Sequence, residues 1–96
     1  MKKETAHDTL MTPQRRINNL VFRYANEKGY TVQVGWGVFE RRYNQKFRTD
    51  LARDMRTFCR SKRLKRLTRT MYLVKSGRID RGMQVIDEMA KEMGNA

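Results

Sequence analysis

The sequence predicts a mainly helical fold, a small bundle of four or five helices with one helix-turn-helix-like pair and one short extended segment. Apolar residues recur every three or four positions through most of the chain, the period of an amphipathic helix. Only one short stretch alternates with a period of two, as a strand does. The 96 residues, 39% of them hydrophobic, suffice for a single core. We therefore expect one helical domain over residues 12–96, preceded by a mobile N-terminal arm over 1–11.

The first helix is predicted over residues 13–28. Thr12 belongs to the residue types that cap helices, and a proline suits the first helical position because its missing N–H has no partner there. One apolar stripe follows, made of Ile17, Leu20, Val21 and Tyr24. Gly29 can adopt the left-handed conformation that commonly ends a helix.

The extended segment is predicted over residues 30–36, where apolar and polar residues alternate in the sequence YTVQVGW. A single strand cannot satisfy its own backbone groups. The segment would therefore pair with the N-terminal arm, pair with another molecule, or serve as an extended connector. Trp36 is expected in the core or, alternatively, as a stacking platform for a nucleic-acid base, a role that Tyr43 could share.

Three helices are predicted over the next part of the chain, a short one over 38–48 and a pair over about 50–60 and 62–75. The pair must break near Ser61, because one continuous helix would place lysine and arginine on its buried face. Ser61 would cap the second helix, whose apolar stripe is expected at Leu64, Leu67, Met71 and Val74. The two helices and their tight turn have helix-turn-helix proportions.

The last helix is expected to begin near Arg78 and to end at Gly94. Its apolar side is Ile79, Met83, Ile86, Met89, Ala90 and Met93. The methionines are interpreted as core residues, with an adaptable surface for a protein partner as the alternative. Because four acidic residues make this helix net acidic, we expect it to pack inside the bundle and not to face a polyanion.

Composition argues against several function classes. Cys59 is the single cysteine and His7 the single histidine, so neither an internal disulfide nor a usual zinc site is expected. The carboxylates are scattered beside basic residues and no histidine lies near Cys59, so we expect no catalytic residue, no cofactor and no enzyme activity. No signal peptide or spanning segment is recognisable. We therefore expect a cytoplasmic protein with neither a membrane partner nor a small-molecule substrate.

The net charge of +12 favours an anionic partner, and most of it lies between residues 41 and 69. The candidate binding residues are Arg41, Arg42, Lys46, Arg48, Arg53, Arg56, Arg60, Lys62, Arg63, Lys65, Arg66 and Arg69. Four of them, Lys62, Lys65, Arg66 and Arg69, would form one face of the predicted helix over 62–75. Such a surface suits direct, largely sequence-nonspecific DNA or RNA binding. It equally suits docking on a protein beside a nucleic-acid channel, and apolar residues expected on polar faces, Phe22 and Leu73, favour that alternative.

Two stretches resemble known families. The sequence MYLVKSGRIDRGMQVIDEMAKEMG over Met71–Gly94 is similar to the turn and second helix of a pentatricopeptide repeat. Those proteins stack many copies, and this chain holds no second one, so the similarity implies a helical hairpin and little about RNA.

The sequences MTPQRRINNL over Met11–Leu20 and WGVFERRYN over Trp36–Asn44 resemble the small basic proteins of temperate-phage recombination regions, most of all the anti-RecBCD proteins. The resemblance implies a non-enzymatic protein that binds the host RecBCD helicase-nuclease in the bacterial cytoplasm and alters or inhibits its activity, so that phage DNA ends survive. Under this interpretation Pro13 becomes a candidate contact for a prolyl isomerase, with the start of the first helix as its alternative role.

Overall fold

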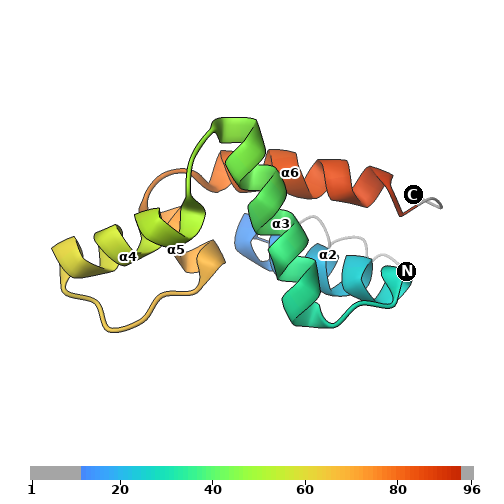
Figure 1. Cartoon of the computed structure of the whole chain (residues 1–96), viewed down its shortest axis with the longest axis horizontal. Coiled ribbons are helices and arrows are strands. Elements are labelled where there is room, and N and C mark those ends of the chain that lie inside the picture. Colours follow the sequence, from blue (N-terminus) through green and yellow to red (C-terminus); the bar gives the residue numbers. More distant parts are fainter. Residues whose placement is uncertain (1–11, 94–96) are drawn as a thin grey trace.

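The computed structural model describes residues 12–93, and this part of the chain is an all-helical bundle without a strand (Figure 1). The helices are α2 (Pro13–Lys28), α3 (Val32–Phe47), α4 (Leu51–Lys62), α5 (Arg69–Lys75) and α6 (Ile79–Lys91). The predicted fold class is therefore confirmed. The N-terminal arm expected over residues 1–11 lies outside the described residues, as does Gly94, the expected end of the last helix.

Helix α2 has the bounds that the sequence predicts. The Thr12 side chain accepts a hydrogen bond from the backbone N–H of Arg15 at 3.2 Å, and Pro13 occupies the first turn. Gly29 ends the helix in the left-handed region, with φ 75°. The cap residue, the proline and the glycine thus act as expected from their conformational preferences.

The extended segment predicted over 30–36 is wrong, because helix α3 begins at Val32 and also includes the short helix predicted over 38–48. Thr31 caps this helix by accepting a hydrogen bond from the Val34 N–H at 3.2 Å. Gly35 lets α3 approach α2 closely, since a Cβ there would lie 3.0 Å from the Cβ of Ala25. Packing against α2 therefore outweighs the strand preference of the valines, which are exposed on the first turn of the helix.

The predicted pair of helices is present, but the tight turn between them and the start of the second helix at residue 62 are wrong. Helix α4 continues through Ser61, whose hydroxyl donates to the Phe58 carbonyl, and it ends at Arg63 in the left-handed region, with φ 57°. Residues 63–68 form a non-helical link, and α5 begins only after Thr68, which caps it. Lys62, Lys65 and Arg66 are exposed, so these charges stay off the buried face, as the sequence predicts. The chain keeps them exposed by leaving the helical conformation over 63–68 and not by starting a new helix at Ser61.

The apolar stripe expected along the second helix of that pair is misplaced. Leu64, Met71 and Val74 are exposed, whereas Tyr72 and Leu73 are buried. The predicted stripe assumes one helix from residue 62, but α5 starts at Arg69 and buries a different side. Leu73, expected on a polar face, therefore belongs to the core.

Helix α6 lies close to its expected bounds and packs closely against α2 and α5. Gly82 makes this approach possible, because a Cβ there would lie 2.8 Å from Leu73 Cδ1 and 3.0 Å from Ile17 Cδ1. Ile86, Met89 and other residues of its predicted apolar side are buried. The methionine side chains of this helix thus contribute to the core, as the first of the two interpretations held.

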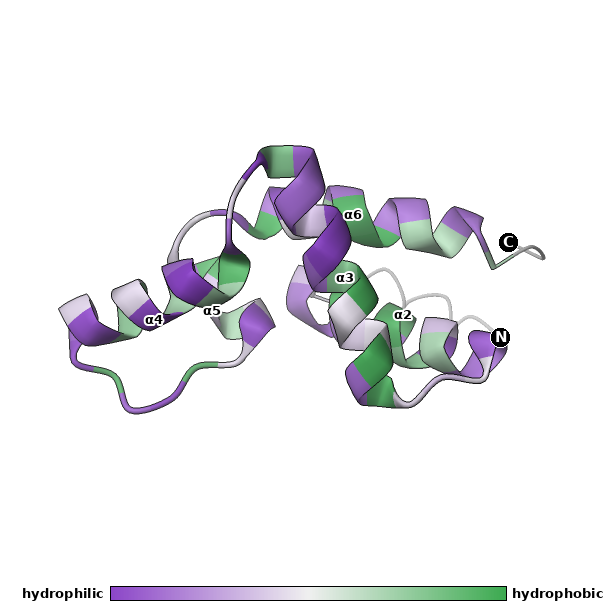
Figure 2. Cartoon of the chain, viewed as in Figure 1, coloured by the Kyte–Doolittle hydropathy of each residue, from purple (hydrophilic) through white to green (hydrophobic). Residues whose placement is uncertain are grey.

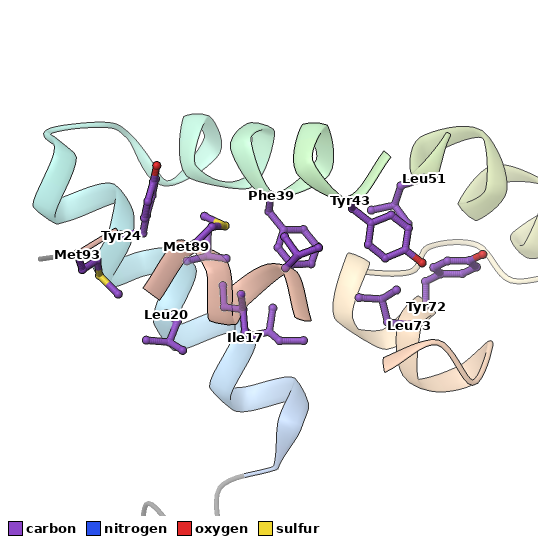
Figure 3. Close-up of a cluster of buried hydrophobic side chains, with 13 residues drawn as sticks. Ile17, Leu20, Tyr24, Phe39, Tyr43, Leu51, Tyr72, Leu73, Met89 and Met93 are labelled. Atoms are coloured by element: carbon purple, nitrogen blue, oxygen red, sulfur yellow. The ribbon is translucent and has the colours of Figure 1, made fainter. Parts of the chain in front are cut away.

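The core is one continuous cluster that reaches from the middle of the bundle to α4 (Figure 3). Ile17, Phe39 and Met89 lie where α2, α3 and α6 meet. Tyr43 and Leu51 extend the cluster to the start of α4. Below, α2, α3, α5 and α6, with those of their cap residues that lie outside 51–68, are called the helical body, and residues 51–68 are called the basic lobe.

The basic lobe extends away from α2 and α6 (Figure 1). Two kinds of contact hold it to the body. At its start, the Leu51 N–H donates to Asn44 Oδ1 at 2.8 Å and the Leu51 side chain is buried. Along α4, the ring of Phe58 meets the ring of Tyr72 edge-on, with centroids 5.3 Å apart. Met55 and Leu67 also pack against the core, and most other side chains of the lobe are exposed.

Candidate functional site

The structure divides the twelve predicted binding residues between two regions. Five lie on the helical body, namely Arg41, Arg42, Lys46, Arg48 and Arg69. Seven lie on the basic lobe, namely Arg53, Arg56, Arg60, Lys62, Arg63, Lys65 and Arg66. The two groups differ in what surrounds them.

Two of the body cations, Arg42 and Lys46, pair with acidic residues of α6 and its C-terminal cap, whereas Arg41 and Arg48 are exposed without an ion pair in residues 12–93. Arg42 Nη2 donates to Glu92 Oε1 at 2.6 Å, and Lys46 Nζ donates to Glu88 Oε2 at 2.7 Å. The hydrogen bond from Arg42 holds the pKa of the Glu92 carboxyl below its ordinary value. The net acidic character of α6 therefore has a structural use, since its carboxylates neutralise charge on α3.

The pairing extends to α2 as well, where Arg16 Nη2 meets Asp87 Oδ1 at 3.1 Å. Both residues are about half exposed, and a surface ion pair of this kind contributes about 0–1 kcal/mol. These ion pairs therefore matter less for the stability that they add than for which charges they compensate. They compensate three cations of α2 and α3, namely Arg16, Arg42 and Lys46.

Arg69 is held at the start of α5 by two groups of α3. Its Nε donates to Glu40 Oε2, and its Cζ lies 5.3 Å from the centre of the Trp36 ring. The predicted basic face of Lys62, Lys65, Arg66 and Arg69 is therefore wrong as a helix face. Arg69 is a packing residue of the body, whereas Lys65 and Arg66 lie on the link over 63–68.

The seven cations of the basic lobe are all exposed. Within residues 12–93, none of them forms an ion pair with a carboxylate. Asp54 is the one acidic residue of the lobe, and it accepts a hydrogen bond from Thr49 Oγ1 at 2.6 Å. Lys62 Nζ lies 5.9 Å from the ring of Phe58, a contact that leaves its charge in place. The lobe is thus a concentration of uncompensated positive charge.

Apolar side chains are interspersed with this charge, and the hydropathy colours alternate along the link from α4 to α5 (Figure 2). Leu64 is 36% exposed on the link, and Met71 is 37% exposed just beyond it. Leu67 is half-buried and contacts the core. A binding partner would therefore meet both cations and apolar atoms.

A groove of about 920 Å³ separates the basic lobe from the body. Four lobe cations line it, namely Arg56, Arg60, Lys65 and Arg66. From the body, Trp36 and Arg69 face the groove beside Glu40, and α2 adds the amides of Gln14 and Asn18. The sequence did not reveal this groove, because its walls come from α2, α3, α4, α5 and the link over 63–68, and the expected extended segment placed Trp36 outside a helix.

Several alternatives can now be decided from the geometry. Tyr43 is 1% exposed and cannot stack on a base, and burial raises the pKa of its hydroxyl. Trp36 is half-buried: it packs against the core and also lines the groove. Cys59, expected in an apolar stripe, is half-buried and lines the same groove. Phe22 is exposed on α2, as predicted.

No set of three or more metal-ligating side chains comes together within residues 12–93. In the same part of the chain, no helix is both long enough and apolar enough to cross a membrane. Comparison with protein-family models, with curated proteins and with solved structures finds no match for this chain.

Proposed function

We propose that this chain is a non-enzymatic, phage-type modulator that binds a host DNA-processing helicase-nuclease of the RecBCD type through the basic lobe and alters its activity. The observation that carries the proposal is the set of seven exposed lobe cations without an ion-pair partner in residues 12–93. Charges of one sign on a projecting segment repel one another, and an anionic partner surface relieves that repulsion.

The mixed character of the surface supports a protein partner. Arginine and methionine are enriched at protein interfaces, and such interfaces combine an apolar centre with a polar rim. The exposed Leu64 and Met71 stand beside lobe cations in this way. The resemblance of Met11–Leu20 and Trp36–Asn44 to anti-RecBCD proteins adds the identity of the complex.

Direct, largely sequence-nonspecific DNA or RNA binding is the second candidate. The specific observation in its favour is a row of arginines, Arg53, Arg56 and Arg60, spaced three and four residues apart on α4 and all exposed. At 1.5 Å of rise per residue the row covers about 10 Å, enough to meet successive phosphates of a backbone. Such binding would weaken steeply as salt increases, because it releases counterions.

The proposal is tested by affinity capture of the tagged full chain from bacterial lysate, with and without exhaustive nuclease digestion, followed by mass spectrometry. Recovery of the helicase-nuclease subunits in stoichiometric amounts after digestion is the expected result. Loss of all enrichment on digestion would contradict the modulator function and favour the second candidate.

The same capture tests the suggested prolyl isomerase. Pro13 is exposed at the first turn of α2, where its missing N–H costs nothing. Pro13→Ala is expected to keep the helicase-nuclease in the captured material and to lose the isomerase. An isomerase recovered equally with both proteins would remove Pro13 from the account and leave it with its helix-starting role.

A further inference from the structure

We propose that the groove between the basic lobe and the body binds a single-stranded nucleic-acid segment, with its phosphates against the lobe cations and a base beside Trp36. This inference goes beyond docking on a protein complex, because it assigns a ligand to a site within the chain itself. It needs no helicase-nuclease to be present. It is consistent with an enzyme complex that separates strands, but it can hold or fail independently of that complex.

The charges around the groove favour an anionic ligand. Arg56, Arg60, Lys65 and Arg66 line the lobe side of the groove, and all four are exposed and unpaired within residues 12–93. The single carboxylate on the groove wall is that of Glu40, which Arg69 already neutralises. Three of the four lobe cations are arginines, whose planar guanidinium groups can bind phosphate through two parallel hydrogen bonds. The groove therefore attracts an extended anion.

Part of the groove wall is apolar. Met55, Leu67 and Met71 line the groove together with Trp36. A duplex offers such a surface mainly sugars and phosphates, because its base faces are stacked inside. A single strand offers planar base faces that can pack on aromatic and apolar side chains. The combination of cations and apolar atoms therefore favours a single strand over a duplex.

The Trp36 ring is held in place before any ligand binds. The Trp36 ring meets the Phe39 ring edge-on, with centroids 5.3 Å apart and planes at 77°. Arg69 lies over the indole and is itself fixed by Glu40. The indole is thus already ordered beside a guanidinium plane. A base that packs on it would cost little side-chain entropy on binding. Gln14 and Asn18 add amides that can contact base edges.

An acidic protein segment could bind the same cations, so the experiment must distinguish it from a single-stranded nucleic acid. Trp36 is the single tryptophan of the chain, and its fluorescence therefore reports on the groove. The purified full chain is titrated with oligothymidylate, with a DNA duplex of equal phosphate number, and with poly-L-glutamate. Binding and Trp36 fluorescence are measured in the same samples.

We expect oligothymidylate to quench Trp36 and to bind about tenfold more tightly than the duplex, as the stacking of a base on an aromatic group would give. Equal or tighter duplex binding without a change in Trp36 fluorescence would overturn the inference. Quenching by poly-L-glutamate but not by oligothymidylate would overturn it as well, and would assign the groove to an acidic protein segment.

Two matched pairs of variants locate the site. Arg56→Glu with Arg66→Glu changes the groove wall, whereas Arg53→Glu with Lys62→Glu makes the same charge change on the lobe outside the groove. All four residues are exposed, so both proteins should fold, which circular dichroism checks. The groove pair is expected to lose oligothymidylate binding at least about tenfold more than the other pair. Equal losses would place the strand elsewhere on the lobe, and the capture experiment on the helicase-nuclease would be unaffected by that result.

Discussion

The helical body and the basic lobe contain the same kinds of charged residue in different surroundings. On the body, Arg42 and Lys46 face the carboxylates of Glu92 and Glu88. On the lobe, seven cations accompany one acidic residue, Asp54, whose carboxylate is already hydrogen-bonded to a threonine. The comparison shows that a dense run of basic residues need not share one environment. Arg42, Lys46 and Arg69 form ion pairs, whereas the lobe cations have no ion-pair partner within residues 12–93.

The two regions also differ in packing. The body buries Ile17, Phe39 and Met89 completely, whereas the one buried residue of α4 is Leu51 at its first position. Because hydrophobic burial is the dominant favourable contribution to folding, the free energy of unfolding should depend mainly on the body. Substitutions on the lobe should instead change binding.

The largest expected effect on stability is that of Phe39→Ala. Phe39 is fully buried between α2, α3 and α6, so its removal leaves a cavity and should lower the free energy of unfolding by about 3–5 kcal/mol. The matched lobe variant, Phe58→Ala, removes a half-buried ring and should cost clearly less. Urea unfolding followed by circular dichroism measures both. Equal losses would mean that the lobe is as much a part of the core as the body.

A smaller change is expected at the contact of α6 with α2 and α5. Gly82→Ala would place a methyl group 2.8 Å from Leu73 Cδ1, and it should destabilise the protein by about 1–3 kcal/mol. Gly37→Ala is the control, because nothing lies within 4 Å of the new methyl and alanine favours a helix. The control should raise the free energy of unfolding by about 0.5–1 kcal/mol. Because both variants gain the same helix propensity, a Gly82→Ala protein as stable as the Gly37→Ala protein would contradict the close approach of these helices.

The smallest effect concerns the ion pairs of the body. Glu92→Gln removes the partner of Arg42 and should lower stability near neutral pH by about 0.2–1 kcal/mol, since the carboxylate is 43% exposed. The depressed pKa of Glu92 gives the sign of the pH dependence. The stabilisation is present above the unfolded-state pKa of about 4.3 and is lost as the pH falls through the lower folded-state value.

The difference in Tm between the unchanged chain and Glu92→Gln should therefore shrink as the pH is lowered from about 7 to about 3. Glu27→Gln, an exposed change on α2, provides the control and should show no such trend. A difference that grows on acidification would mean that Glu92 is not stabilised as the carboxylate.

Local chemistry predicted a large part of the fold. Thr12, Pro13 and Gly29 bounded α2 correctly because caps and prolines act within a few residues. At the start of α3 the capping signal of Thr31 competes with a second local pattern. Its valines favour a strand, and the preference is overcome by the contact of Gly35 with α2, which no local pattern reveals. The same applies to α5, where the link over 63–68 changes which side chains face inward.

The sequence predicts which residues belong to the candidate site, but not how they are arranged in space. The twelve basic residues could be named from the sequence, yet the carboxylates that pair with Arg42 and Lys46 lie 50 and 42 residues further along the chain. Arg69 illustrates the point. It belongs to the basic run, and its contacts with Glu40 and Trp36 make it a residue of the body.

The central claim is that the position of charge, and not its total, creates the binding surface. The direct test compares two triple variants with the same change in net charge, in binding to the purified helicase-nuclease after nuclease treatment. Arg53→Glu, Lys62→Glu and Arg63→Glu alter the lobe, and Arg15→Glu, Arg23→Glu and Lys91→Glu alter exposed positions of the body.

The account predicts that the lobe variant loses at least about tenfold in affinity at the same salt concentration, while the body variant stays close to the unchanged chain. Equal losses in two folded proteins would show that net charge alone drives the interaction and would contradict the account.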